Sequence, residues 1–270
     1  MLTFSNIRTQ IQEKNYVEVP CALSRKDFLE AAEHFISFLE LPDSVKRKFY
    51  YTLDPADRGS VLGYLRKNKV MGDGDDKEYF HYHPAGEELF QDILLKNNPT
   101  IKKFFDSAYR VYQEASSIAK KIVEILDPHF PGLSERFFPT GRQERAMVRF
   151  LKYDSKKPGD FLARAHYDRG GFALALAESA PGLRIGRDEH TLREVVHREY
   201  SALFMPAIYF KALTSKAFSP AWHDVVQRSE DVVAKDIARW AIVFFTNAEG
   251  MKPPTVEETH KPVPRYHGRV

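Results

Sequence analysis

The order of the sequence patterns limits the folds open to this chain, because helical periodicity dominates its first half and short β-prone segments dominate its second. From Arg145 on, apolar runs such as MVRFLKYD and RWAIVFF are brief and are separated by Gly, Pro or charged turns. A succession of short strands of this kind is typical of sandwiches and jelly rolls. We therefore predict a mainly β protein with helices, in which a double-stranded β-helix (jelly-roll) core is braced by N-terminal and central helices.

Two helices are marked clearly in the first half. A helix over about 24–41 begins with a capping arrangement at Ser24 and repeats apolar residues at helical spacing. A longer helix over about 100–126 carries an apolar side and should brace the barrel. The sequence also predicts a short strand over about 16–21 and a short helix over 45–51.

Composition favours a single domain. The 270 residues contain no linker, low-complexity run or repeat, so we predict one domain over 1–270, with a helix-rich part over 1–130 and the jelly-roll core over 131–270. The 40 basic and 37 acidic residues are interleaved and leave a net charge of +3, which does not indicate nucleic-acid binding. The longest apolar runs are too short to span a bilayer, and the N-terminus lacks the apolar core of a signal peptide. A lone cysteine, Cys21, fits a reducing compartment, and we expect a cytoplasmic protein.

Three residues in the second half of the chain carry the chemistry: His166 and Asp168 in AHYDRGG, and His223 in PAWHDVV. Two imidazoles and one carboxylate can hold Fe(II) on one face of the ion and leave the opposite face open for a co-substrate and O2. A His-x-acid pair alone is weak, because 10 histidines and 37 acidic residues among 270 predict about 1.4 such pairs by chance. The context favours this pair, since it ends a β-prone segment before the Gly170-Gly171 turn, where side chains can project into the mouth of a barrel.

A second such pair, His197 and Glu199, lies in the charged run TLREVVHREY. Its alternation predicts a half-exposed strand, and we interpret the pair as a solvated face. His223 taken by itself would also suit a partly buried histidine beside Trp222. Arg239, which follows it, opens the β-prone run RWAIVFF, and an arginine that points into a barrel needs an anion.

Together these segments resemble the isopenicillin N synthase-like branch of the 2-oxoglutarate- and Fe(II)-dependent dioxygenases. FLELPDSVKRKFYY is similar to the family's helix-Leu-Pro-Lys segment, GSVLGYLRK to its Gly-Tyr turn, and DDKEYFHY to its Asp-Lys-Glu-Phe stretch. MVRFLKYD is similar to the strand that ends in a co-substrate-binding tyrosine, and PGLRIG resembles the Gly-Leu-Gln-Val strand. The resemblance covers nearly the whole chain, and its strength lies in the shared order of the pieces.

The resemblance implies that His166, Asp168 and His223 are the iron ligands and catalytic residues. It implies that Arg239 binds the distal carboxylate of 2-oxoglutarate, a task that suits a bidentate guanidinium, and that Tyr153 donates a hydrogen bond to the same co-substrate. The implied reaction is hydroxylation, desaturation or ring closure of a small-molecule substrate with O2, with release of succinate and CO2. Ascorbate is a candidate further reductant.

Three departures from the family pattern matter. Its Arg-x-Ser becomes Arg239-Trp240-Ala241, so a hydroxyl that helps to hold the distal carboxylate is absent. Such a loss costs about 1–3 kcal/mol when the partner is left bare. The Asn that usually lies two residues before the tyrosine is Leu151. The spacing from His223 to Arg239 is longer than usual, and we expect the charged insert QRSEDVVAKD to form an exposed hairpin tip.

Two alternatives remain open. Ala241 is compatible with an iron oxidase on the same fold that does not use 2-oxoglutarate. His81, His83 and Glu87 in HYHPAGEE imitate the His-x-His-x3-Glu spacing of a cupin, so the second alternative is a cupin-like metal-binding protein without oxygenase activity. Under the oxygenase hypothesis the same segment would lie near the barrel mouth, where His81 or Tyr82 could meet the substrate.

Overall fold

Most helices come before most strands, as the sequence predicts. The computed structural model describes residues 2–52, 61–67, 77–94, 98–141, 145–154, 157–228 and 237–250. The helices are α1 (Phe4–Lys14), α2 (Arg25–Leu39), α3 (Asp43–Lys46), α4 (Ala85–Leu89), α5 (Gln91–Leu94), α6 (Pro99–Leu126), α7 (Leu133–Phe137) and α8 (Ile208–Leu213). The strands are β1 (Val17–Pro20), β2 (Tyr50–Thr52), β3 (Val61–Lys67), β4 (Lys77–Tyr82), β5 (Arg145–Asp154), β6 (Phe161–His166), β7 (Phe172–Glu178), β8 (Leu183–Gly186), β9 (Arg193–Glu194), β10 (Ser201–Pro206), β11 (Trp222–Val226) and β12 (Ile237–Asn247).

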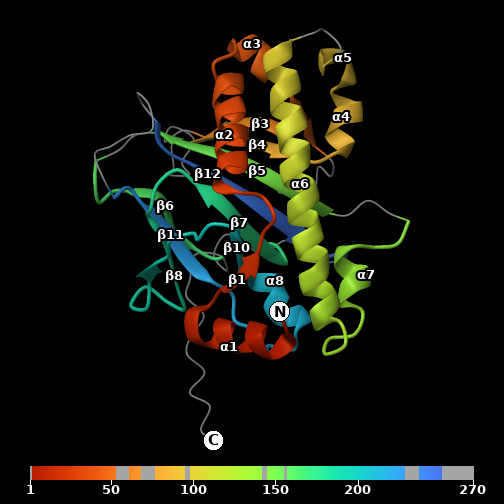
Figure 1. Cartoon of the computed structure of the whole chain (residues 1–270), viewed down its shortest axis with the longest axis vertical. Coiled ribbons are helices and arrows are strands. Elements are labelled where there is room, and N and C mark those ends of the chain that lie inside the picture. The colour runs from red at the N-terminus through yellow and green to blue at the C-terminus, as the bar shows by residue number, and fades with distance from the viewer. Residues whose placement is uncertain are drawn as a thin grey trace, which may run out of the picture.

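The strands form two antiparallel sheets (Figure 1). The large sheet has the order β1-β10-β7-β12-β5-β4-β3-β2, and the small sheet has the order β6-β11-β8-β9. From β5 to β12, consecutive strands alternate between the two sheets, except that β8 and β9 are neighbours in the small one. At one edge of the large sheet β1 pairs with β10, and on the other side β4 pairs with β5 and is followed by β3 and the edge strand β2. Strands from the first third of the chain therefore extend a sheet built by the second half.

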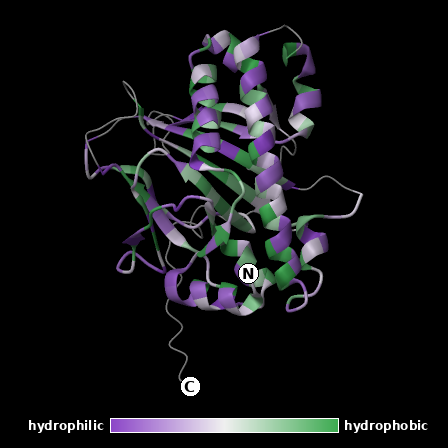
Figure 2. Ribbon diagram, in the orientation of Figure 1, coloured by the Kyte–Doolittle hydropathy of each residue, from purple (hydrophilic) through white to green (hydrophobic). Residues whose placement is uncertain are grey.

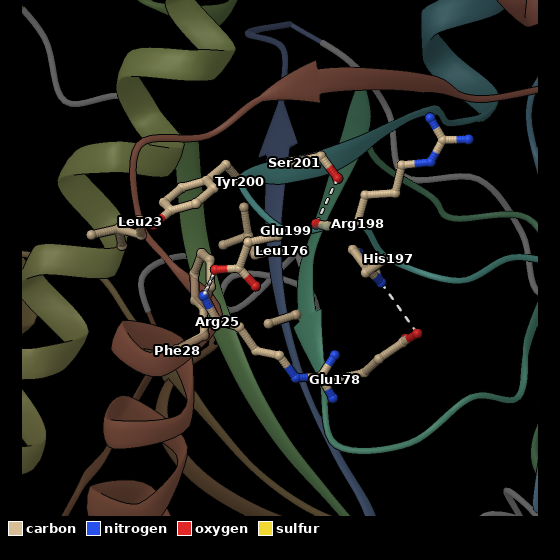
Figure 3. Close-up of a pocket in the computed structure, with 11 residues that line it drawn as sticks. Leu23, Arg25, Phe28, Leu176, Glu178, His197, Arg198, Glu199, Tyr200 and Ser201 are labelled. Atoms are coloured by element: carbon tan, nitrogen blue, oxygen red, sulfur yellow. Dashed lines mark hydrogen bonds and ion pairs between the residues drawn. The ribbon is translucent and has the colours of Figure 1, made fainter.

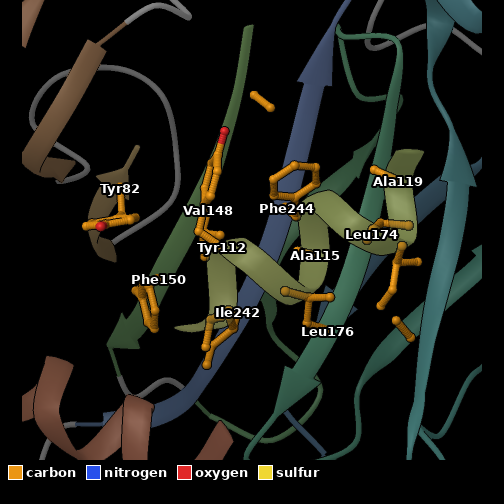
Figure 4. Packing of buried hydrophobic residues seen from close by; sticks show 14 of the residues in the cluster. Tyr82, Tyr112, Ala115, Ala119, Val148, Phe150, Leu174, Leu176, Ile242 and Phe244 are labelled. Carbon is orange, nitrogen blue, oxygen red and sulfur yellow. The ribbon is translucent and has the colours of Figure 1, made fainter. Parts of the chain in front are cut away.

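Helices α2 and α6 pack on one face of the large sheet (Figure 1). In Figure 4, Tyr112 and Ala115 of α6 lie against residues of β5, β7 and β12, and the rings of Tyr112 and Phe244 are 5.7 Å apart between centroids. Figure 2 shows α6 banded in purple and green, because apolar residues recur every three or four positions along it. The predicted bracing helix is confirmed. None of the helices in the described part of the chain is long and apolar enough to cross a membrane.

A second apolar cluster lies between the two sheets. It combines Leu151 and Tyr153 of the large sheet with Leu162 and Val225 of the small one, among others. Side chains alternate along a strand, so β5 directs Leu151 and Tyr153 toward the small sheet and Phe150 toward the helices, where Phe150 joins the helix-side core. The face of the large sheet that carries Leu151 and Tyr153 is called its inner face below.

The start of α2 is capped as predicted. The Ser24 hydroxyl accepts a hydrogen bond from the Asp27 backbone N–H at 3.3 Å, and the Asp27 carboxylate accepts one from the Ser24 backbone N–H at 2.9 Å. The two reciprocal bonds satisfy donors that a helix start would otherwise leave bare. The strand predicted over about 16–21 is likewise present as β1.

The short helix predicted over 45–51 is wrong. Helix α3 ends at Lys46, and β2 begins at Tyr50, where it pairs with β3. A long-range pairing partner thus overrides the local preference of this segment. Helix α1 was not predicted, and of the predicted hairpin tip QRSEDVVAKD, residues 229–236 lie outside the described residues.

Candidate functional site

His166 and His223 occupy neighbouring strands of the small sheet. His166 is the last residue of β6, His223 is the second residue of β11, and the two are direct partners in the strand register. Asp168 follows two residues after His166, and its backbone carbonyl accepts a hydrogen bond from the N–H of Ile208 at 3.1 Å. Strand pairing and this bond therefore hold the three side chains on a defined backbone.

The turn after Asp168 requires its two glycines. A Cβ atom on Gly170 would lie 2.5 Å from the Thr246 carbonyl oxygen, and a Cβ atom on Gly171 would lie 2.1 Å from the Phe137 ring. Neither distance is possible for a real side chain, so the chain can approach β12 and α7 only because these residues have none. This close packing fixes the position of the Asp168 loop.

The three side chains form a compact cluster. One ligand atom from each of His166, Asp168 and His223 lies within 4.8 Å of the others. His166 Nε2 is 3.8 Å from Asp168 Oδ1, and His223 Nε2 is 3.9 Å from Asp168 Oδ2. These separations are too long for hydrogen bonds and suit three groups arranged around a common ion. Of the residues that the structure describes, this is the set of three with metal-binding geometry.

Local hydrogen bonds select the ring nitrogen that each histidine offers. His166 Nδ1 lies 2.7 Å from the Arg164 carbonyl oxygen, and His223 Nδ1 lies 3.0 Å from the Ala221 carbonyl oxygen. A carbonyl only accepts, so each Nδ1 carries the proton and each Nε2 carries the lone pair. Metal-binding histidines usually donate such a hydrogen bond from the ring nitrogen that does not face the ion.

The electrostatics keep His166 in its neutral form. Burial, and then the neighbouring His223, lower the pKa of His166 to about 4, although the Asp168 carboxylate opposes them. The side chains of His166, Asp168 and His223 are 29%, 15% and 10% exposed. Neutral imidazoles and an accessible carboxylate are the donor set that a divalent transition metal requires, so these three residues fit Fe(II).

Arg239 points toward the inner face and is 3% exposed. It pairs in register with Tyr153 of β5, and its guanidinium carbon lies 6.0 Å from the centre of the Tyr153 ring. Its Nε donates to the Ala180 carbonyl oxygen at 2.9 Å, and its Nη2 donates to the Glu178 carboxylate. The structure therefore brings the two predicted co-substrate residues together, and the chain itself supplies the anion that a buried arginine needs.

Glu178 and His197 are the residues that sequence reasoning missed. Glu178 ends β7 and is 8% exposed, and His197 Nδ1 lies 3.2 Å from its Oε1. The interpretation of His197 as part of a solvated face is wrong, because its side chain is 8% exposed and its Nε2 lies 2.8 Å from the Ala175 carbonyl oxygen. Nor does it lie in a strand, since β9 ends at Glu194. The available signal was the position of Glu178, a carboxylate at the end of an otherwise apolar strand.

A small pocket adjoins Glu178 and His197 (Figure 3). Its lining comes from α2, β7, β10 and the segment before β10, and includes Arg25 and Glu199. Its volume of about 30 Å³ leaves room for little more than a water molecule. None of His166, Asp168 and His223 lines it, so it is not where a substrate meets the metal cluster.

The alternative metal site at His81 and His83 is not assembled. His81 Nδ1 lies 2.6 Å from the Val61 carbonyl oxygen, and His81 Nε2 accepts a hydrogen bond from Arg149 Nε at 2.6 Å. Both ring nitrogens are thus occupied. His83 Nδ1 accepts from the Ala85 backbone N–H at 3.1 Å. These bonds give both histidines structural roles.

The expected substrate contact of Tyr82 is also wrong. Tyr82 is 1% exposed and packs on the helix side of the large sheet, with its ring centroid 5.7 Å from that of Phe105. Its hydroxyl donates a hydrogen bond to Glu87. Glu87 is the third residue of the cupin-like pattern, so its carboxylate is already engaged by Tyr82. His81 is 4% exposed, so neither residue presents an open surface.

Comparisons with known proteins agree with this architecture. No family model matches the sequence, and no curated protein matches it. Among solved structures, the dioxygenase for auxin oxidation 1 from Arabidopsis thaliana, in a binary complex with 2-oxoglutarate, has a TM-score of 0.70 at 15% identity, over 90% of this chain and 87% of that one. JOX2 in complex with 2-oxoglutarate, Fe and JA has a TM-score of 0.68 at 16% identity, over 94% and 74%.

A third structure extends the comparison. A full-length protein from Neurospora crassa, in complex with alpha-ketoglutarate (2-oxoglutarate) and thymine, has a TM-score of 0.65 at 15% identity, over 90% of this chain and 79% of that one. All three are structures with 2-oxoglutarate bound. At sequence identities this low, the structural similarity establishes a shared fold and nothing further. The chain has the fold of the 2-oxoglutarate- and Fe(II)-dependent oxygenases, in agreement with its sequence resemblance to the isopenicillin N synthase-like branch.

Proposed function

We propose that this protein is an Fe(II)-dependent oxygenase that uses 2-oxoglutarate as co-substrate and hydroxylates, desaturates or cyclises a small molecule. The observation that carries the proposal is the cluster of His166, Asp168 and His223, whose ligand atoms lie within 4.8 Å of one another on a fold shared with such oxygenases. The alternation of strands between two sheets supports a jelly-roll core, and the extension of one sheet by β1 to β4 supports a single domain. The cytoplasmic location stays a prediction.

In the proposed site, His166 and His223 bind Fe(II) through Nε2 and Asp168 binds it through a carboxylate oxygen. Bound Fe(II) supplies the redox chemistry that activates O2, and the oxidation of 2-oxoglutarate to succinate and CO2 balances the electrons. The protein's own contribution is geometric. The paired strands and the glycine turn would hold the three ligands around a common ion, and the coordination positions that they do not fill would be open to a co-substrate and O2.

The fit of 2-oxoglutarate depends on Arg239. This arginine is buried beside Tyr153, where a guanidinium and a phenol could bind a carboxylate. However, the carboxylate of Glu178 already contacts the guanidinium, and Ala241 lacks the hydroxyl found in the family pattern. A co-substrate carboxylate must therefore share Arg239 with Glu178 or displace it.

This pairing is also the specific reason to keep a second candidate function. If Glu178 neutralises Arg239 permanently, the same fold and metal cluster would serve an iron oxidase that draws its electrons from another donor. Such an enzyme would bind Fe(II) as tightly as the leading candidate but would form no complex with 2-oxoglutarate.

Anaerobic titration of Fe(II) and then 2-oxoglutarate into the metal-free protein tests the proposal. Chelation of Fe(II) by 2-oxoglutarate gives a weak visible charge-transfer band, which we expect in the wild type. We expect no band in Asp168→Ala and a much higher 2-oxoglutarate requirement in Arg239→Ala. Tight Fe(II) binding without a band would favour the oxidase, and no Fe(II) binding would refute both candidates.

A further inference from the structure

Arg239, Glu178 and His197 form a buried chain of charged and polar groups. Their side chains are 3%, 8% and 8% exposed. One carboxylate oxygen of Glu178 contacts Arg239 Nη2, and the other lies 3.2 Å from His197 Nδ1. Glu178 therefore occupies the guanidinium to which the proposed function assigns an external carboxylate.

The residue opposite Glu178 accommodates this arrangement. Ala241 is the direct register partner of Glu178 across β12 and β7, and it lies two residues beyond Arg239 on the same face of β12. A hydroxyl at this position would help to hold an external carboxylate, whereas a methyl group leaves room for the side chain of Glu178. The hydroxyl that Ala241 lacks and the carboxylate that Glu178 supplies thus belong to directly paired residues.

We infer that Glu178 is an internal competitor for Arg239, which sets how tightly and how selectively this site takes the far carboxylate of 2-oxoglutarate. The inference rests on the proposed function. The co-substrate carboxylate binds Arg239 only in the fraction of molecules in which Glu178 has released it, so the apparent association constant is the intrinsic one multiplied by that fraction. Two carboxylates on one guanidinium would leave a net negative charge in a buried place, which is unfavourable. The co-substrate carboxylate is therefore expected to replace Glu178 at Arg239, and the two carboxylates are not expected to bind the guanidinium together.

The surroundings give the released carboxylate another partner. Glu178 borders the pocket in Figure 3, which is also lined by His197 and Arg25. Burial alone would raise the pKa of Glu178, but Arg239, His197 and then the charge of Arg25 outweigh it and lower the pKa. A small rotation away from Arg239 would thus keep Glu178 beside His197 and bring it toward a second cation.

The inference is tested by measuring the dissociation constants of two 2-oxo acids with the anaerobic Fe(II) protein. One is 2-oxoglutarate, and the other is 2-oxovalerate, which has the same chain length but no far carboxylate. In Glu178→Gln and Glu178→Ala we expect 2-oxoglutarate to bind at least about tenfold more tightly, while 2-oxovalerate changes by less than about twofold. Glu199→Gln is the matched control, because Glu199 lines the same pocket but contacts the Arg25 backbone N–H, and it should change neither constant.

Folding of the variants is checked in the same samples. Glu178→Ala leaves the buried Arg239 without its carboxylate and is expected to be less stable, whereas Glu178→Gln keeps a side chain of the same shape. Added 2-oxoglutarate should raise the melting temperature of Glu178→Ala more than that of the wild type, because it restores an anion at Arg239. Should Glu178→Ala fail to fold, the affinities of Glu178→Gln decide the question.

The outcomes separate the inference from the proposed function. If both acids bind but neither Glu178 variant tightens 2-oxoglutarate, Glu178 is not a competitor and the proposed function stands. If neither acid forms a complex in any variant although Fe(II) binds, both the inference and the use of a 2-oxo acid are refuted. A selective gain for 2-oxoglutarate supports both.

Discussion

His166 and His223 face each other across the paired strands β6 and β11, with their ring centroids 4.4 Å apart. Each ring directs its Nδ1 to a local carbonyl oxygen, so a metal bound to both Nε2 atoms links two strands that already pair. Such a link exists only in the folded chain, and metal binding must therefore stabilise the fold.

Anaerobic Fe(II) at about 100 times its dissociation constant should raise the free energy of unfolding by about 2.7 kcal/mol. For a chain of this size, that corresponds to a rise in Tm of roughly 5–10 °C. Thermal unfolding of the wild type and His223→Ala, with and without Fe(II), measures the effect. An equal rise in His223→Ala would show that the metal binds elsewhere.

Gly170→Ala should destabilise the protein and weaken Fe(II) binding together. The new Cβ atom would lie 2.5 Å from the Thr246 carbonyl oxygen, so the turn that carries Asp168 must move, at a cost of about 1–3 kcal/mol. Gly86→Ala is the matched control, because its nearest neighbour would be an ordinary 3.5 Å from the new atom, and this helical position should keep its stability or gain up to about 1 kcal/mol. Urea unfolding and Fe(II) titration test the pair, and a Gly170→Ala protein with unchanged Fe(II) affinity would contradict the role of the turn.

Ser24→Ala should lower the free energy of unfolding by about 1 kcal/mol, because it removes the cap of α2. Its hydroxyl accepts from the Asp27 N–H at 3.3 Å. Ser37→Ala, at an exposed position inside the same helix, should have little effect or a slightly favourable one. Chemical unfolding of both variants measures the difference, and equal stabilities would argue against the cap.

Asp27 makes stability depend on pH in the acid range. Hydrogen bonds from Ser24 and then from Arg110 lower the pKa of Asp27 from 3.8 to about 2 in the folded protein. A lowered folded pKa means that this contribution is complete above about pH 4 and is lost as the pH falls toward 2. The urea midpoint of Asp27→Asn should fall less steeply than that of the wild type in this window. Asp106→Asn removes a carboxylate from an exposed i,i+4 ion pair, and its urea midpoint should fall with pH as steeply as that of the wild type. Identical slopes in all three proteins would contradict the role given to Asp27.

Local signals explain which parts of the fold were predictable. Helices α2 and α6 follow from caps and apolar periodicity within their own sequences, and β1 follows from a short apolar run. The segment 45–51 failed because its end pairs with β3, a contact that no local pattern records. The metal cluster was accessible because residue type and order suggest His166, Asp168 and His223 before their distances are known.

The co-substrate region was predictable only in part. The inward direction of Arg239 and its neighbour Tyr153 agree with the strand pattern. Its partner Glu178 lies 61 residues away and reaches Arg239 through the pairing of β7 with β12. Because register between distant strands is set by the whole sheet, the sequence alone could not identify Glu178 as the anion, nor His197 as buried beside it.

The most direct test of the central claim is the stoichiometry and affinity of anaerobic Fe(II) binding by calorimetry. The wild type, His83→Ala and the exposed-site control His190→Ala should each bind one Fe(II) with similar affinity. His166→Ala, Asp168→Ala and His223→Ala should each bind at least about a hundredfold more weakly, since even the loss of a residue that only supports a ligand costs 10–100-fold. Fe(II) binding that survives all three of these substitutions, or that is lost in His83→Ala, would contradict the claim that these residues form the iron site.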